Sequence, residues 1–203
     1  MYFKSGMGEE KSANFVSVML SIIHKEAEIS AVEYVRGYRD AERFVAMCAQ
    51  CDNYGKQWGC PPFDFDVDAM LEGYSRVRVF ATQAYFDKPL LERVMTADER
   101  KIETKRALDY MWKDLLPRLY ALEQEHEGSR IFTGRCRLCG AAACARVDGK
   151  ACRHYERLRY SLEAVGFDVV KTARELLGIE LLWSTDNHLP EYVTLITAIF
   201  LKD

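Results

Sequence analysis

Residues 136–152 read CRLCGAAACARVDGKAC, and this stretch holds four of the seven cysteines of the chain. The four thiols follow the spacing C-x2-C-x4-C-x7-C, which is close enough to bind one inorganic centre without ligands from elsewhere. Gly140, Gly149 and the small residues at 141–143 allow the backbone to wrap tightly and to direct N–H groups at sulfur. We therefore predict one metal site made of Cys136, Cys139, Cys144 and Cys152, the four-cysteine group.

The other three cysteines, Cys48, Cys51 and Cys60, form a second set with the pattern C-x2-C-x8-C-P-P. We predict that this three-cysteine group binds a second metal centre. Three thiolates leave one position of a four-coordinate site unfilled. Either a fourth protein ligand closes the site, or the open position accepts water or a substrate, as in catalytic metal centres. The candidate closing ligands are Asp52, His154, His188 or a cysteine of the four-cysteine group.

The identity of the metal is constrained by the cysteine spacing. Zinc ribbons use two C-x2-C knuckles separated by a longer span, and here only the first pair of each group has that form. The remaining, uneven spacings suit the wider perimeter of a cubane cluster. We therefore predict one or two iron–sulfur clusters of the 4Fe-4S type, with zinc as the alternative.

Composition and charge narrow the class of protein. A chain of 203 residues that is 49% hydrophobic can form one core, so we predict a single metal-binding domain over residues 1–203. The net charge of −3 gives no basic excess for binding nucleic acid. The apolar runs at 15–23 and 192–201 are too short to span a membrane, and the first lacks a cleavage site. We expect a cytoplasmic protein, in which an odd number of cysteines disfavours disulfides.

Local patterns predict an α/β or α+β fold with a small mixed or antiparallel sheet, packed helices and two cysteine-rich metal loops. Strands are expected at residues 29–38, 77–86, 130–133 and 192–201. Helices are expected at residues 13–27, 40–51, 66–74, 89–126, 155–165 and 169–177. Thr96 and Glu99 form a capping-box pair, and Pro117 should kink or restart the long helix.

Both cysteine groups lie within longer motifs. The first motif is Cys48, Cys51, Tyr54, Gly55, Trp58, Cys60, Pro61 and Pro62; the second is Cys136, Cys139, Gly140, Cys144, Cys152 and Arg153, followed by the run 160–164 and Gly166. With these residues the chain resembles a widespread bacterial and archaeal family of predicted metal-binding proteins known as a domain of unknown function. The resemblance spans nearly the whole chain. It implies an iron–sulfur protein of anaerobic or facultative microbes, and it supplies no reaction.

Three functional hypotheses follow from these residues. The leading one is an iron–sulfur protein that transfers electrons to a redox partner protein or supports a redox enzyme. The alternative is a zinc-stabilised structural or binding module, in which the metal only holds the loops. A third hypothesis makes the three-cysteine group an open Lewis-acid centre of an enzyme.

Overall fold

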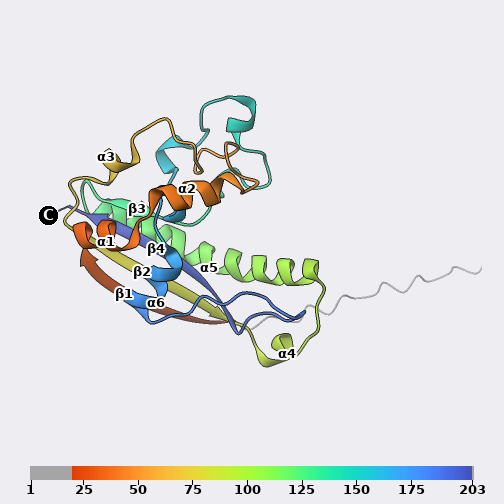
Figure 1. Ribbon diagram of the computed structural model, residues 1–203. Helices are drawn as coiled ribbons and strands as arrows, with labels where there is room; N and C mark the ends of the chain where they lie inside the picture. Colours follow the sequence, from red (N-terminus) through yellow and green to blue (C-terminus); the bar gives the residue numbers. More distant parts are fainter. Residues whose placement is uncertain (1–19, 203) are drawn as a thin grey trace, which may run out of the picture.

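The fold is built on one antiparallel sheet of four strands in the order β1-β2-β4-β3. The computed structural model describes residues 20–202 of the chain. The strands are β1 (Ser21–Ser30), β2 (Arg76–Tyr85), β3 (Arg130–Phe132) and β4 (Tyr192–Leu201). β2 and β4 pair along their whole length, from Arg76 opposite Leu201 to Tyr85 opposite Tyr192, and they form the centre of the sheet (Figure 1).

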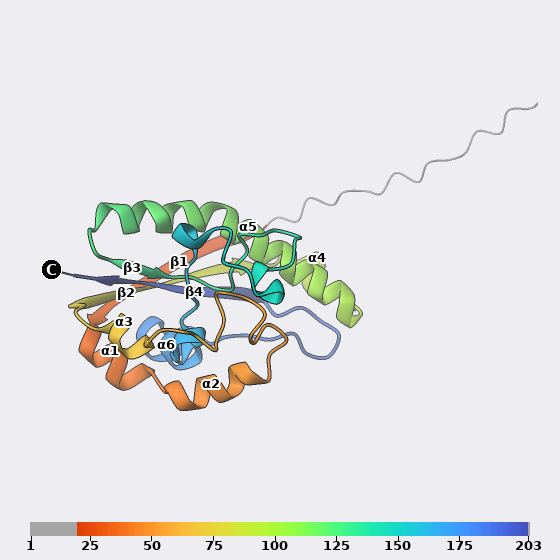
Figure 2. The same cartoon turned by 90° about the horizontal axis from the view of Figure 1, so that it is seen from above.

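Helices cover both faces of this sheet. They are α1 (Ala31–Tyr38), α2 (Ala41–Ala49), α3 (Val67–Leu71), α4 (Lys88–Leu91), α5 (Ala97–Glu125) and α6 (Val169–Leu177). Figure 2 shows α5 on one face, with α1, α2 and α6 on the other. Strand alternation explains the two layers, because neighbouring side chains point to opposite faces. In β4, Phe200 joins the core shared with α1 and α6, whereas Ile199 joins the core under α5.

The long helix α5 begins with the expected capping box. The Glu99 N–H donates to the Thr96 hydroxyl, while the Thr96 N–H donates to the Glu99 carboxylate. The helix continues through Pro117, so the expected restart there is wrong. Pro117 and Lys113 are both exposed, and water can reach the carbonyl that lacks its helical donor.

Two predicted elements near the start of the chain differ from the structure. The helix expected at 13–27 lies partly outside the described residues, and its second half belongs to β1, which pairs with β2. The strand expected at 29–38 is instead α1, because the Ser30 side chain caps a helix whose inner face carries Ala31 and Tyr34. Tyr34 is fully buried and stacks on Phe167 with ring centroids 4.7 Å apart. Tertiary packing therefore outweighs the strand-like composition of this segment.

A further difference lies after the four-cysteine group. The helix expected at 155–165 is replaced by two short 3-10 turns, η2 (Tyr155–Arg157) and η3 (Glu163–Val165). The residues between them run beside β3, where the Thr133 N–H donates to the Tyr160 carbonyl at 2.8 Å. This pairing keeps the chain extended and prevents a continuous helix.

The predicted fold class is confirmed: a mixed α/β arrangement with a small antiparallel sheet and packed helices. The extent of the domain, 1–203, stays a prediction. Within the described part of the chain, no helix has the length and apolar character needed to cross a membrane. The loops at 50–66 and 133–160, which carry all the cysteines except Cys48, lie side by side in both views (Figures 1 and 2).

Candidate metal centre

The three-cysteine group begins where α2 ends. Asp40 caps the start of α2, and Cys48 lies in its last turn. The Cys51 N–H donates to the Cys48 carbonyl at 2.9 Å, so both thiols of the C-x2-C pair are carried by one tight turn. Cys60 lies at the other end of the loop, followed by the cis peptide bond between Pro61 and Pro62.

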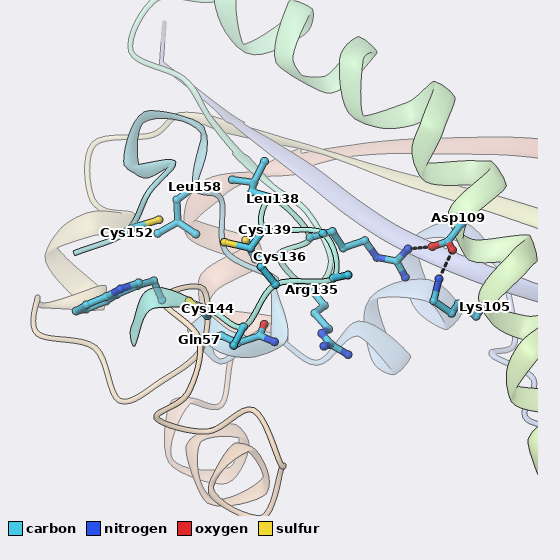
Figure 3. A pocket seen from close by; sticks show the side chains of 16 residues that line it. Gln57, Lys105, Asp109, Arg135, Cys136, Leu138, Cys139, Cys144, Cys152 and Leu158 are labelled. Atoms are coloured by element: carbon cyan, nitrogen blue, oxygen red, sulfur yellow. Dashed lines mark hydrogen bonds and ion pairs between the residues drawn. The ribbon is translucent and has the colours of Figure 1, made fainter. Parts of the chain in front are cut away.

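The four-cysteine group lies on the loop that leaves β3. Its four thiols line one open pocket of about 550 Å³, whose wall also includes side chains from α5 and from the loop after α2. Figure 3 shows Cys136, Cys139, Cys144 and Cys152 around this pocket. A short 3-10 turn, η1 (Ala145–Asp148), lies between Cys144 and Cys152. All seven cysteines of the chain are free thiols.

Hydrogen-bond donors reach several of the sulfur atoms. The His154 N–H donates to Cys152 Sγ at 3.4 Å, and Arg153 Nη1 lies 3.7 Å from Cys139 Sγ. The same Arg153 nitrogen donates to the Ala143 carbonyl at 2.9 Å, which fixes the side chain across the loop. Such donors tune the properties of any centre that the sulfur atoms bind.

The two cysteine loops are joined by one arginine and one tryptophan, here called the inter-loop clamp. Arg146, from η1, donates to the carbonyls of Gln57 at 2.9 Å and of Cys60 at 2.6 Å, and also to that of Pro62. Its guanidinium lies 5.1 Å from the Trp58 ring centroid. Trp58 in turn donates its indole N–H to the Lys150 carbonyl at 3.0 Å. The clamp therefore holds the two cysteine loops against each other.

Gly59 allows a close approach between the two loops. A Cβ atom at this position would lie 3.1 Å from Cys136 Cβ, which is tighter than ordinary van der Waals contact. The residue is buried beneath the four-cysteine loop. A larger residue between Trp58 and Cys60 would have to push the Cys136 side chain away by a few tenths of an ångström.

The cysteine thiols influence one another electrostatically across the two groups. Burial raises the pKa of Cys60 to about 11, and the neighbouring thiols of Cys51, Cys48 and Cys136 add to this rise, while Arg135 opposes it. Burial also raises the pKa of Cys136. Without a metal these thiols are protonated at neutral pH, so metal binding must release protons.

Glu163 lies beside the three-cysteine group, a position that the sequence patterns did not predict. It lies in η3, which packs against α2. Burial raises the pKa of Cys48, and the neighbouring Cys51 and Glu163 add to this rise. Burial raises the pKa of the Glu163 carboxyl itself. Its presence in the run 160–164 of the second motif was the available signal, but nothing local marked it as a neighbour of Cys48.

The candidate closing ligands of the three-cysteine group lie in different parts of the structure. His188 lies beside α4, where Nδ1 is 3.2 Å from the Leu91 carbonyl, far from the cysteine loops (Figure 1). His154 belongs with the four-cysteine group through its N–H bond to Cys152. Asp52 is exposed at the loop surface. Cys136 lies against Gly59, the residue before Cys60, where an added Cβ atom would be 3.1 Å from Cys136 Cβ.

A comparison with protein families supports the same class of protein. The family model described as "Predicted metal-binding protein (DUF2284)" matches residues 35–201, a range that contains both cysteine groups. The chain belongs to this family. The resemblance found in the two cysteine motifs is thereby confirmed. Neither a curated protein nor a solved structure matches the chain.

The donor chemistry suits the metal-binding family, since the seven clustered side chains are all thiols and thiolates select zinc and iron–sulfur centres. Within residues 20–202, however, no three histidine, cysteine, aspartate or glutamate side chains are placed to hold one metal ion as they stand. The four thiols surround a shared pocket and would have to turn toward one another to bind. The ligand roles of all seven cysteines therefore stay predictions.

Proposed function

We propose that the four-cysteine group binds an iron–sulfur cluster and that the protein transfers electrons or assists a redox enzyme. The observation that supports this most is the shared pocket lined by Cys136, Cys139, Cys144 and Cys152. Its four soft ligands match the number that a 4Fe-4S cluster takes. When bound, such a cluster would supply one-electron chemistry.

The surrounding residues fit this role. The His154 N–H and the Arg153 guanidinium donate toward sulfur, and such donors favour the reduced, more negative state of a cluster. The pocket is open, so a second protein could approach the thiols. We propose that this second protein is the redox partner and that the exchange takes place in the cytoplasm.

The three-cysteine group would hold a second centre beside the first. The clamp through Arg146 and the close contact between Gly59 and Cys136 support a short path between the two groups. Cys136 is positioned to serve either group, because it lines the shared pocket and also lies near Cys60.

A zinc-stabilised binding module is the second candidate. The observations that favour it are the tight turn that carries Cys48 and Cys51 and the turn that contains Cys139. The Cys51 N–H donates to the Cys48 carbonyl, and the Gly140 N–H donates to the Arg137 carbonyl at 3.0 Å. Zinc knuckles use the same C-x2-C spacing. In this case the metal would hold the loops and would show no redox change.

Anaerobic purification followed by metal analysis separates the two candidates. The iron–sulfur proposal expects iron and sulfide, visible absorption, and an electron paramagnetic resonance signal after reduction. Cys139→Ser should lose the cluster of the four-cysteine group, whereas Cys48→Ser should affect only the second centre. A colourless protein that retains zinc alone after anaerobic reconstitution would contradict the proposal and support the zinc module.

A further inference from the structure

A second cavity of about 340 Å³ adjoins the four-cysteine loop on the side of α5. It lies between α5 and the two segments that flank the four-cysteine group. Five cationic side chains and no acidic one line this cavity, although the chain as a whole carries more acidic than basic residues. We call it the basic pocket; its cationic residues are Lys113, Arg135, Arg137, Arg157 and Arg159.

Two of these five charges are neutralised from outside the cavity. Arg137 pairs with Asp109 on α5, and Arg159 Nε donates to both Glu123 oxygens at 2.9 Å. The other three, Lys113, Arg135 and Arg157, have no carboxylate within 4.0 Å in the part of the chain from 20 to 202. Like charges gathered without counter-charges repel one another, so the pocket favours an anion.

The walls of the basic pocket hold the charges in place. Tyr120 donates its hydroxyl to the Arg157 carbonyl at 2.6 Å. The guanidinium groups of Arg157 and Arg159 lie 5.7 and 5.4 Å from the Tyr120 ring centroid. Trp112 and Leu116 add an apolar wall from α5. Guanidinium groups already positioned on an aromatic ring lose less freedom when a ligand binds.

A simpler explanation would be that these cations offset the charge of the thiolates. The geometry separates the two roles. The pocket that the four thiols line includes Cys139, Cys144 and Cys152, and none of these three lines the basic pocket. Conversely, Lys113 and Arg157 line only the basic pocket. Arg135 and Arg137 line both pockets, and Arg153 bonds to the cysteine loop on the side of the thiols.

We propose that the basic pocket binds a small organic anion. Lys113, Arg135 and Arg157 hold its phosphate or carboxylate groups, and Trp112 and Leu116 contact its apolar part. The segment 135–138 forms the wall between the two pockets, so the bound anion lies against Cys136. The site is a property of α5 and the flanking loops, and it does not depend on the identity of the metal.

Isothermal titration of the full chain with inorganic pyrophosphate and with citrate tests the proposal and separates phosphate from carboxylate recognition. The double variant Lys113→Gln/Arg157→Gln removes two charges without touching a cysteine. Its matched control is Lys101→Gln/Arg118→Gln, which removes two exposed cations of α5 that lie outside the pocket. At least one anion should bind saturably, about tenfold or more weakly in the pocket variant and unchanged in the control.

Absence of saturable binding by both anions overturns the proposal, as does equal weakening in the pocket and control variants. Metal content is measured on the same samples and should not change in either. Cys139→Ser separates this proposal from the metal function, because the residue does not line the basic pocket. Loss of metal with retained anion binding is the expected result for that variant.

Discussion

The sheet and the cysteine loops are held together in different ways. In the sheet, β2 pairs with β1 and β4 along ten-residue ladders, and Val77, Val79 and Phe200 are fully buried. The cysteine loops have few such ladders and are joined by side chains that bond to backbone carbonyls, chiefly Arg146 and Trp58. Apolar burial stabilises the sheet, whereas a few polar contacts hold the two loops against each other.

The largest effect should come from the sheet core. Phe200 is fully buried and its ring contacts four other aromatic rings, those of Tyr34, Tyr74, Phe132 and Phe167. Phe200→Ala should lower the free energy of unfolding by about 3–5 kcal/mol, because it removes the ring and leaves a cavity. Urea unfolding measures the change. Trp183→Ala, at a side chain that is 72% exposed, should change it by less than about 0.5 kcal/mol.

A second substitution tests the junction between sheet and loop. Gly134 follows β3, and a Cβ there would lie only 2.8 Å from Trp112 Cζ2, in a buried ring. Gly134→Ala should destabilise the protein by about 1–3 kcal/mol through overpacking. Gly37→Ala is the control, because that position lies in α1 with open space around it and should be neutral or stabilising. Equal thermal unfolding of both variants would contradict the contact with Trp112.

The inter-loop clamp should have a smaller effect on unfolding and a larger one on the metal. Arg146→Ala removes the bonds to three carbonyls of the three-cysteine loop. The free energy of unfolding of the metal-free protein should fall by about 1–2 kcal/mol. Metal loss to a chelator should become faster, since the two groups are no longer held together. Arg118→Ala on α5 is the control, and wild-type metal retention in Arg146→Ala would show that the clamp is not needed.

The smallest expected effect is on how stability depends on pH, and it comes from Glu163. Burial raises the pKa of its carboxyl above the ordinary value of 4.5, so the folded state favours the protonated form. The carboxyl contributes fully to stability when the pH is below its ordinary pKa. This contribution is lost as the pH rises through the raised pKa of the folded state. Glu163→Gln should therefore stabilise the metal-free protein at pH 7, and this gain should vanish below about pH 4. A gain that persists in acid, or one shared by the exposed control Glu72→Gln, would contradict this assignment.

Much of the fold could be predicted from local patterns. The strand at 192–201 matches β4, and the one at 77–86 differs from β2 by one residue at each end. The Thr96–Glu99 capping box is also confirmed. These elements carry strong local signals, namely continuous β-branched and aromatic runs or a paired cap. The strand β1 was missed because its polar residues, such as His24, Lys25 and Glu26, belong to an edge strand whose faces are half exposed.

The candidate site could be predicted only in part. The cysteine spacing indicated both groups and the family, because the thiols of each group are close together in the chain. No pattern indicated that Arg146 would reach the loop of Cys60, or that Glu163 would lie near Cys48. Those contacts join residues far apart in sequence, and they depend on how two irregular loops pack.

The amino-acid sequence by itself determined the two sets of thiols, the family and most of the sheet, since these depend on the spacing of neighbouring residues. Only the tertiary structure decided that both sets lie on adjoining loops, joined by Arg146, with a basic pocket on the side of α5. The physical reason is that loop position follows from the antiparallel pairing of β3 with β4 and from packing against α5, which are long-range contacts without a local signature.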